Sequence, residues 1–279
     1  MSRPVAVGVD GSEESLAAVE WAADEAAARG AGLRLVNASQ WQEHLLQGVK
    51  PSRETTAERT RTLVEAAEER ARARHPELSL TTEEREDSPA SMLLGEAADA
   101  QMLVLGSNGL GGVGGFIIGS VAQEVVADAR NPVVVVRPDS GGRPAGGGAM
   151  RRVVVGLDVR DVKAELLEFA FDYAARHTAP LHVVHTWHHP AFHHDSGETA
   201  ERESALAAAV RPFRDRFPAV KVSEEAAPGR AGSHLVEAAS NAGLVVVGRR
   251  RAARGSHIGS VTHAVLHHAP CPVAVVPHA

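Results

Sequence analysis

The amino-acid sequence predicts an α/β chain of two tandem domains, each a doubly wound parallel sheet of five strands. The first observation is an internal repeat: VAVGVDGS at residues 5–12 returns as VVVGLDVR at 153–160, and NPVVVV at 131–136 returns as CPVAVV at 271–276. The second is that short, almost continuously apolar runs alternate with helical patterns. Such runs are typical of parallel strands that helices cover on both faces.

The repeat also sets the expected domain boundaries. We expect one domain over residues 1–138, a linker over 139–150 and a second domain over 151–279. The linker, DSGGRPAGGGAM, has too few apolar residues to build a core and is typical of a flexible connection. The second copy is shorter than the first between its first and fourth strands, and again in the loop after the fourth strand.

The elements of the first copy follow in order. Residues 5–9 predict a strand, and residues 12–30 predict a helix with an acidic first turn, apolar residues at helical spacing and a terminal glycine. Alternation in LSLTTEERE, residues 78–86, predicts a strand near an edge of the sheet. The remaining pattern predicts strands over 33–38, 102–106 and 132–138, and helices over 53–75, 88–99 and 119–129.

Composition excludes several classes of protein. The net charge is −6, so no basic surface points to nucleic acid. The single cysteine, Cys271, excludes an intramolecular disulfide, fits a reducing compartment and is expected to be a small buried residue. The N-terminus has no signal-peptide pattern, and no apolar run approaches the ~20 residues of a membrane span. We therefore expect a cytoplasmic protein that binds neither nucleic acid nor membranes.

A glycine-rich stretch, GSNGLGGVGGFIIGSV at residues 106–121, follows the fourth strand. Glycine lets the backbone approach a ligand closely and point its N–H groups at phosphate oxygens. The helix that follows adds unpaired N–H groups and a partial positive charge at its start. Doubly wound sheets bind ligands at the carboxyl ends of their strands. The stretch therefore predicts a phosphate-binding site.

Two other phosphate-binding patterns fit less well. The chain contains no G-x-x-x-x-G-K-[ST], which excludes a P-loop. GLGGVG at residues 109–114 matches the dinucleotide fingerprint G-x-G-x-x-G, but it follows the fourth strand rather than the first. GFII also separates it from the helix, which argues against a dinucleotide fold.

Two residues separate Gly106 from Gly109, and nine residues separate Gly109 from the pair Gly119-Ser120. This spacing resembles the nucleotide-binding motif of the universal stress protein family. VGVDGS at the end of the first strand and GSV before the last strand agree with it, and the resemblance covers both copies and nearly the whole chain. It implies the strand order 3-2-1-4-5, ATP held between strands one and four, and dimerisation through strand five. By this resemblance the chain is a tandem universal stress protein, an ATP-binding module for stress response or signalling.

The resemblance assigns candidate ATP-binding residues in the first copy. Asp10 would lie near the adenosine, the backbone around Asn37 would flank the adenine, and the glycines would wrap the phosphates. Asn108 departs from the basic residue frequently found in the family. The alternative for Asp10 and Ser120 is that each only caps a helix. The full set is Gly8, Asp10, Ala38, Gly106, Ser107, Asn108, Gly109, Gly111, Gly112, Gly119, Ser120 and Val121.

The second copy keeps only part of this motif. Arg251 stands where the second glycine belongs, and only seven residues separate it from Gly259. A Cβ at a position that needs positive φ strains the backbone, whereas arginine forks bind phosphate well. We expect the first domain to bind ATP more tightly, and an arginine-based site for a different anion stays open. The candidates are Gly156, Asp158, Gly248, Arg249, Arg251, Arg254, Gly259 and Ser260.

Metal and catalytic signals are weak. Mg²⁺ is expected to accompany the triphosphate, with the Asp10 carboxylate near the phosphates. The histidine-rich segment 185–195 matches no closed zinc pattern and is interpreted as a solvated loop, and His263 and His267 are spaced to bridge a metal on one helix. No nucleophile with a base, and no acid pair with a clear site, predicts catalysis. A weak ATPase, a self-phosphorylating enzyme and a structural dimer with degenerate sites remain the alternatives.

The fifth strands, residues 132–138 and 272–278, are valine-rich. Left alone, both would be flat sheet edges, which proteins seldom expose. We expect them to pair across the domains and form a pseudo-twofold dimer within one chain, while pairing of two chains into a homodimer stays open. The protein partner cannot be read from the sequence.

Overall fold

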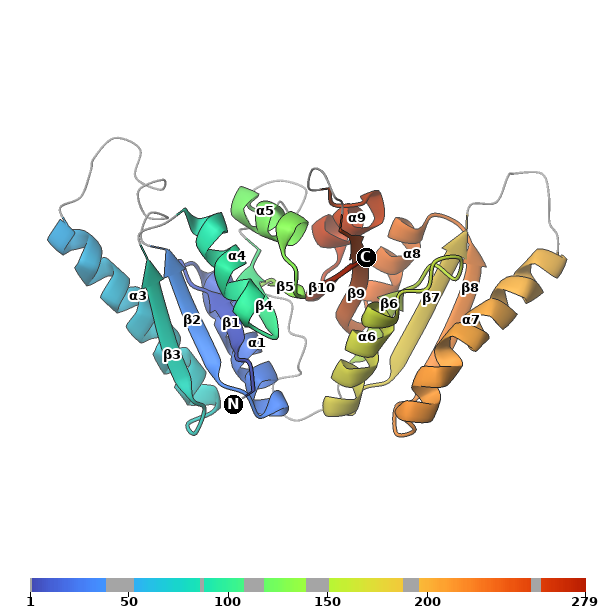
Figure 1. Cartoon of the computed structure of the whole chain (residues 1–279), viewed down its shortest axis with the longest axis horizontal. Helices are drawn as coiled ribbons and strands as arrows, with labels where there is room; N and C mark the ends of the chain where they lie inside the picture. Colours follow the sequence, from blue (N-terminus) through green and yellow to red (C-terminus); the bar gives the residue numbers. More distant parts are fainter. Residues whose placement is uncertain are drawn as a thin grey trace. The chain divides into compact units, whose positions relative to one another are not determined.

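The computed structural model describes residues 2–38, 53–85, 88–107, 118–138, 151–187, 196–251 and 257–279. The chain divides into two compact units, Met1–Pro138 and Asp139–Ala279. Each unit is an α/β domain in which a parallel sheet lies between two layers of helices (Figure 1).

The sheet of the first unit has the strand order β3-β2-β1-β4-β5, and all pairings are parallel. The predicted fold class and strand order are confirmed. Helices α1 and α3 pack together on one face, and α4 and α5 pack together on the other. The elements are β1 (Val5–Gly8), α1 (Glu13–Arg29), β2 (Leu33–Ala38), α3 (Arg53–Arg74), β3 (Leu80–Arg85), α4 (Pro89–Asp99), β4 (Met102–Gly106), α5 (Ser120–Asp128) and β5 (Val133–Val136).

The second unit repeats this arrangement in the order β8-β7-β6-β9-β10, again with parallel pairings. Its helices α6 and α7 pack together, as do α8 and α9. The elements are β6 (Arg152–Gly156), α6 (Ala164–Arg176), β7 (Leu181–Trp187), α7 (Ser196–Arg216), β8 (Val222–Pro228), α8 (Ala231–Ala239), β9 (Ala242–Arg250), α9 (Ser260–His268) and β10 (Val273–His278).

Local hydrogen bonds define both ends of helix α1. Ser12 is its N-cap, and the Ser12 side chain accepts a hydrogen bond from the Ser15 backbone N–H at 3.1 Å. Gly30 ends the helix at φ 59°, where a left-handed residue lets its N–H reach back to the last turn. Both caps satisfy backbone groups that would otherwise lack partners.

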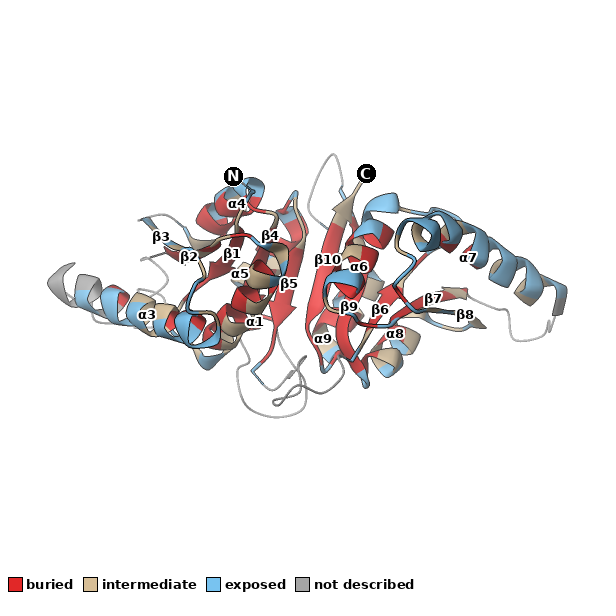
Figure 2. Cartoon of the chain, turned by 90° about the horizontal axis from the view of Figure 1, so that it is seen from below, coloured by how far each residue is buried: buried red, intermediate tan, exposed pale blue. Residues whose placement is uncertain are grey.

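The core of each unit consists of the central strands and the helix faces turned toward them, as the buried residues in Figure 2 show. Val5, Val7, Leu103 and Val104 are fully buried in the first sheet. Cys271 is buried, as predicted. In the described ranges, no helix is both long and apolar enough to cross a membrane.

Candidate functional site

The predicted motif residues of the first unit meet at the carboxyl end of its sheet. Gly8 ends β1 opposite Val36 of β2, and Gly106 ends β4 opposite Val136 of β5. β1 lies between β2 and β4, so the order of the strands in the sheet reverses at this point. Doubly wound sheets bind ligands where the strand order reverses. A small pocket of about 80 Å³ lies at this point, lined by Gly8, Asp10, Ser12, Ser15, Leu105, Gly106, Gly119, Ser120, Val121 and Ala122.

Asp10 orders the start of α1 without capping it. Its Oδ1 accepts hydrogen bonds from the backbone N–H of Ser12 at 2.9 Å and from the Ser12 hydroxyl at 2.6 Å. The Ser12 oxygen is itself the cap, so the interpretation of Asp10 as the N-cap is wrong. Asp10 also lines the pocket, so one carboxylate oxygen positions the turn while the residue faces the candidate site.

Gly106 has a packing reason to be glycine. A Cβ built on it would lie 2.5 Å from the backbone carbon of Glu14 and 2.7 Å from the backbone nitrogen of Ser15. Real Cβ atoms do not approach backbone this closely, so the end of β4 can pass the first turn of α1 only without a side chain. The neighbouring Ser107 is buried, and its N–H donates to Val136 O at 2.7 Å, so this N–H is already used in the sheet.

The starts of α5 and α9 are built alike. Gly119 is the N-cap of α5 at φ −59°, ψ 150°, and Gly259 is the N-cap of α9 at φ −58°, ψ 155°. The interpretation of Ser120 as a cap is therefore wrong, because Ser120 is the first helical residue and is exposed. The candidates Asn108, Gly109, Gly111, Gly112 and Arg254 lie outside the described residues. Ala38 ends β2 opposite Arg85.

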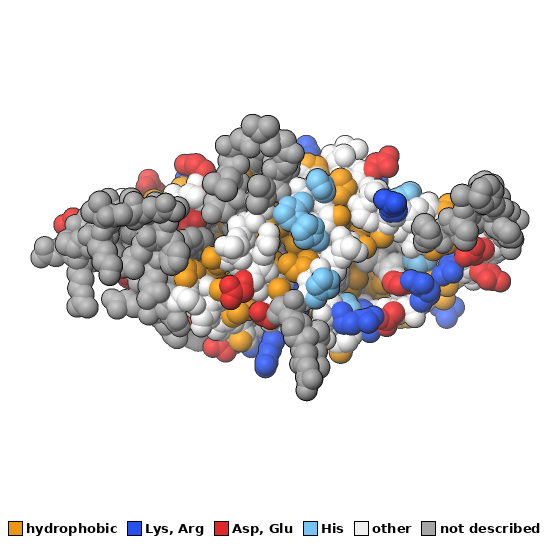
Figure 3. Space-filling model, turned by 90° about the horizontal axis from the view of Figure 1, so that it is seen from above, with side chains coloured by type: hydrophobic (Ala, Val, Ile, Leu, Met, Phe, Trp, Pro, Cys, Tyr) orange, Lys and Arg blue, Asp and Glu red, His pale blue; other side chains and the backbone are white. Residues whose placement is uncertain are grey.

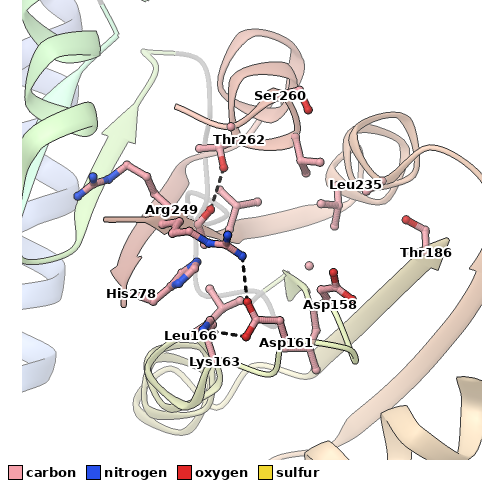
Figure 4. Close-up of a pocket in the computed structure, with 18 of the residues that line it drawn as sticks. Asp158, Asp161, Lys163, Leu166, Thr186, Leu235, Arg249, Ser260, Thr262 and His278 are labelled. Atoms are coloured by element: carbon pink, nitrogen blue, oxygen red, sulfur yellow. Dashed lines mark hydrogen bonds and ion pairs between the residues drawn. The ribbon is translucent and has the colours of Figure 1, made fainter. Parts of the chain in front are cut away.

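The second unit holds a much larger pocket, of about 590 Å³, at the corresponding end of its sheet. Figure 4 shows it between the ends of the strands, the turn before α6, and helices α8 and α9. Arg251 does not line it; its N–H donates to His278 O at 2.8 Å. Six of the predicted residues line it: Gly156, Asp158, Gly248, Arg249, Gly259 and Ser260. Arg250, one of the arginines whose positive charge sequence reasoning weighed for an anion site, lines it as well. Sequence reasoning missed five further lining residues: Arg160, Asp161, Lys163, Thr186 and His257.

Asp158, the counterpart of Asp10, is held by an arginine. Arg160 Nε donates to Asp158 Oδ1 at 3.1 Å, and Arg160 Nη2 donates to Oδ2 at 2.9 Å. The counterpart of Arg160 in the first unit is Ser12, so the same carboxylate position is oriented by a hydroxyl in one unit and a guanidinium in the other. The hydrogen bond from Arg160 lowers the pKa of Asp158 below its ordinary value of 3.8.

Removing this guanidinium should raise the pKa of Asp158. In the wild-type chain the lowered pKa means that the pair stabilises the fold above the ordinary pKa and is lost as pH falls through the lowered value. We expect Arg160→Gln to move the titration midpoint of the Asp158 carboxyl upward in a carbon-detected NMR titration. Arg216→Gln, which breaks an ion pair with Glu168 far from Asp158 in sequence, is the control and should leave it unchanged. An unchanged midpoint in Arg160→Gln would refute the assignment.

The end of β7 brings an unpartnered hydroxyl to the pocket. Thr186 Oγ1 is buried and, within the part of the chain that the structure describes, has no hydrogen-bond partner. Thr186 lines the pocket, and Figure 4 shows its hydroxyl on the pocket side of the strand. A buried polar group without a partner destabilises a protein unless something bonds to it. The counterpart of Thr186 in the first unit is Ala38. An alignment of the two copies would have shown a hydroxyl in the second unit where the first has a methyl group.

His185 corrects the interpretation of the histidine-rich segment as a solvated loop. It lies within β7, is 1% exposed, and its Nδ1 is 2.9 Å from Leu157 O. Asn37 holds the same position in the first unit, where its Nδ2 donates to Val9 O at 2.7 Å. His185 in the second unit therefore takes the place of the Asn37 side-chain amide in the first, where each side chain contacts the equivalent backbone oxygen. Residues 188–195, the rest of the segment, lie outside the described residues.

The second histidine signal lies on α9. The rings of His263 and His267 face one another with centroids 4.2 Å apart. Figure 3 shows histidine side chains gathered on the face seen from above. Among the residues that the structure describes, no group of three or more histidine, cysteine or acidic side chains is placed to hold a metal ion.

Comparisons with known proteins agree with this architecture. The model of the universal stress protein family matches residues 1–137 and 150–277. A universal stress protein of Mycolicibacterium smegmatis is 31% identical over 293 residues, covering 98% of this chain and 96% of that one. Another, of Mycobacterium tuberculosis strain H37Rv, is 32% identical over 305 residues and covers 99% of both chains. The crystal structure of a universal stress protein from Archaeoglobus fulgidus superposes with a TM-score of 0.73 over 100% of both chains at 17% identity, which shows a shared fold.

Proposed function

The chain belongs to the universal stress protein family, and on that premise we propose that each unit binds ATP at the carboxyl end of its sheet. The chain would then act in stress response or signalling in a way that depends on whether nucleotide is bound. The proposal extends the family membership to a ligand, and the pocket of the second unit is the observation that carries it.

The pocket of the second unit fits a nucleotide in size and chemistry. Its volume of about 590 Å³ lies in the range of small-molecule sites. Its lining includes the start of α9, whose free N–H groups favour an anion, and the side chains of Arg250 and His257. The end of β7 contributes the unpartnered Thr186 hydroxyl, which a nucleobase or ribose can satisfy. Phosphates would therefore lie toward α9 and the nucleoside toward β7.

The first unit supports the same proposal by a different means. The described residues that line its pocket are mostly glycine, serine and apolar residues, and Asp10 is the only charged residue among them. Binding there would rest on backbone N–H groups, which salt screens less than the exposed cations of the second unit. We therefore retain the prediction that the first unit binds ATP more tightly, and we expect the difference to widen as salt rises.

Mg²⁺ is proposed as a companion of the nucleotide. Asp10 supplies a carboxylate at the first pocket, and its Oδ1 is already committed to Ser12. The ion would thus depend mainly on phosphate oxygens, as is usual for Mg²⁺. We expect a chelator to weaken ATP binding measured by calorimetry, and equal affinity with and without the chelator would overturn this part of the proposal.

Blocking variants assign the ATP sites to the two units. Gly259 lines the second pocket, a Cβ on it meets nothing within 4 Å and its φ is negative, so Gly259→Phe should add a ring at the pocket without a steric clash at its Cβ. Gly119→Phe is its counterpart in the first unit. We expect the full chain to bind ATP in a calorimetric titration and each variant to lose one binding event. Gly95→Phe, which adds the same side chain at an exposed position on α4, should lose neither.

The outcomes separate this function from its alternatives. Absence of ATP binding by the wild-type chain would leave a structural dimer with degenerate sites. Release of labelled phosphate would indicate an ATPase, and label retained on the chain would indicate self-phosphorylation. We expect binding with neither, because no residue has been assigned as a catalytic base that would activate water.

A further inference from the structure

A chain of ion pairs crosses one side of the second pocket. Asp161 Oδ1 is 2.8 Å from Lys163 Nζ, and Asp161 Oδ2 is 3.1 Å from Arg250 Nη2. Asp161 and Lys163 belong to the turn before α6, whereas Arg250 is the last residue of β9, and all three line the pocket. The dashed lines in Figure 4 mark these contacts. One carboxylate therefore ties the end of β9 to the turn before α6.

The link between Arg250 and Asp161 is easily opened. The Arg250 side chain is 73% exposed and the Asp161 side chain 44% exposed. Ion pairs this exposed contribute little to stability, so little is lost when Arg250 changes partner. A phosphate group offers more charge and more acceptor oxygens than a carboxylate, and it accepts the guanidinium fork with two hydrogen bonds. A polyphosphate in the pocket is thus a stronger partner for Arg250 than Asp161 is.

Asp161 competes for Arg250, but its charge is not left unpaired by the exchange. When Arg250 leaves, the Asp161 carboxylate keeps its contact with Lys163, whose side chain is 24% exposed. The negative charge beside the incoming phosphates therefore stays compensated.

The first unit has no equivalent of this device. In register, Asn108 replaces Arg250, Glu13 replaces Asp161 and Ser15 replaces Lys163. Ser15 is buried, and its hydroxyl donates to Ser12 O within the first turn of α1. Among the described residues, the ion-pair chain therefore has no counterpart in the first unit.

We propose that Arg250 is an exchangeable phosphate-binding residue: it pairs with Asp161 in the empty pocket and passes to the phosphates of a bound polyphosphate or nucleotide. The second unit would thereby select ligands by the number of their phosphate groups. This inference rests on the proposed function for the nucleotide, but the exchange itself needs only a polyphosphate.

The test uses the full chain with Gly119→Phe, so that only the second unit binds, and titrates it with ATP, AMP and inorganic tripolyphosphate. We expect Arg250→Gln to weaken ATP and tripolyphosphate binding about tenfold, as for the loss of one charged hydrogen bond, and AMP binding less than about twofold. We expect Asp161→Asn to strengthen ATP binding a few-fold, because the competing acceptor is gone. Arg216→Gln, which removes an exposed ion-paired arginine outside the pocket, should change nothing.

Two results would overturn the proposal. One is an equal loss of AMP and ATP affinity, or no loss, in Arg250→Gln. The other is weaker ATP binding in Asp161→Asn, which would make Asp161 a ligand rather than a competitor. If tripolyphosphate binds through Arg250 and ATP does not bind, the exchange stands and the proposed function fails. If ATP binds and is indifferent to Arg250, the function stands and the exchange fails.

Discussion

Gly106→Ala is expected to destabilise the first unit by roughly 2–3 kcal/mol, the upper part of the range for overpacking. The added methyl would meet backbone atoms of Glu14 and Ser15 at 2.5–2.7 Å, and these cannot move without displacing the first turn of α1. The same turn carries the hydrogen bonds from Ser12 to Asp10, so the candidate site should be disturbed as well.

Gly248→Ala is the matched control in the second unit. Its added methyl would meet the ring of His278 at 3.0 Å and the side chain of Leu166 at 3.7 Å, both of which are side chains that can shift. We expect it to cost less than about 1 kcal/mol.

Hydrogen exchange of the full chain, followed by mass spectrometry, measures the two units separately. Peptides of α1 and β4 should lose protection in Gly106→Ala, and those of α6 and β9 should change little in Gly248→Ala. Equal effects of the two substitutions would show that the close approach at Gly106 is not what requires glycine.

Proline at Val135 and Val275 together is expected to lower the stability of the chain by about 1–3 kcal/mol for each hydrogen bond lost if the fifth strands are paired, as the sequence predicts. On the β4 side of β5, the carbonyl oxygen of Pro132 accepts a hydrogen bond from Leu103 N–H at 3.0 Å. The carbonyl oxygen of Val136 accepts one from Ser107 N–H at 2.7 Å. Backbone groups of a parallel strand alternate in direction, so the Val135 N–H points away from β4.

The Val275 N–H likewise points away from β9. The carbonyl oxygens of Pro272 and His278, an even number of residues apart along β10, accept hydrogen bonds from the β9 side, from Val245 N–H at 3.0 Å and Arg251 N–H at 2.8 Å. Val275 lies between these positions in the alternation and so faces the other way. Proline at these two positions therefore leaves the pairing within each unit intact. A strand edge that faces solvent tolerates such a proline. Calorimetric melting and small-angle scattering should show a lower transition and a more extended chain in the double variant.

Val134→Pro is the positive control, because the Val134 N–H points toward β4 and its loss should destabilise the first unit in any case. If the double variant melts and scatters like wild type, the outer edges of the fifth strands are not paired, and the predicted pseudo-dimer is wrong.

Strands β2 and β4 show how far the sequence could lead. Both were predicted with the bounds that the structure has. The reason is clearest for β4, an apolar run that helices cover on both faces and that ends abruptly at Gly106. The glycine end of α1 could be predicted because Gly30 acts on its own neighbours in sequence, whereas the N-cap is Ser12 and not Asp10.

The second pocket shows where sequence reasoning ends. Arg160, Asp161 and Lys163 look like a solvated charge run, and only the folded turn brings them to the end of β9. His185 looked like part of a polar tract because composition does not reveal that a strand continues through it. Its match to Asn37 emerges only once the two sheets are in register, where both side chains bond to the same backbone position.

The most direct test of the central claim is a crystal structure of the full chain grown with a non-hydrolysable ATP analogue. We predict a nucleotide in the pocket of the second unit, with its phosphates between the start of α9 and Arg250 and its nucleoside against Thr186, and a second nucleotide at Gly8, Asp10 and Gly119. Crystals grown at saturating analogue with both sites free of nucleotide, or with nucleotide bound elsewhere, would contradict the assignment of these pockets as ATP sites.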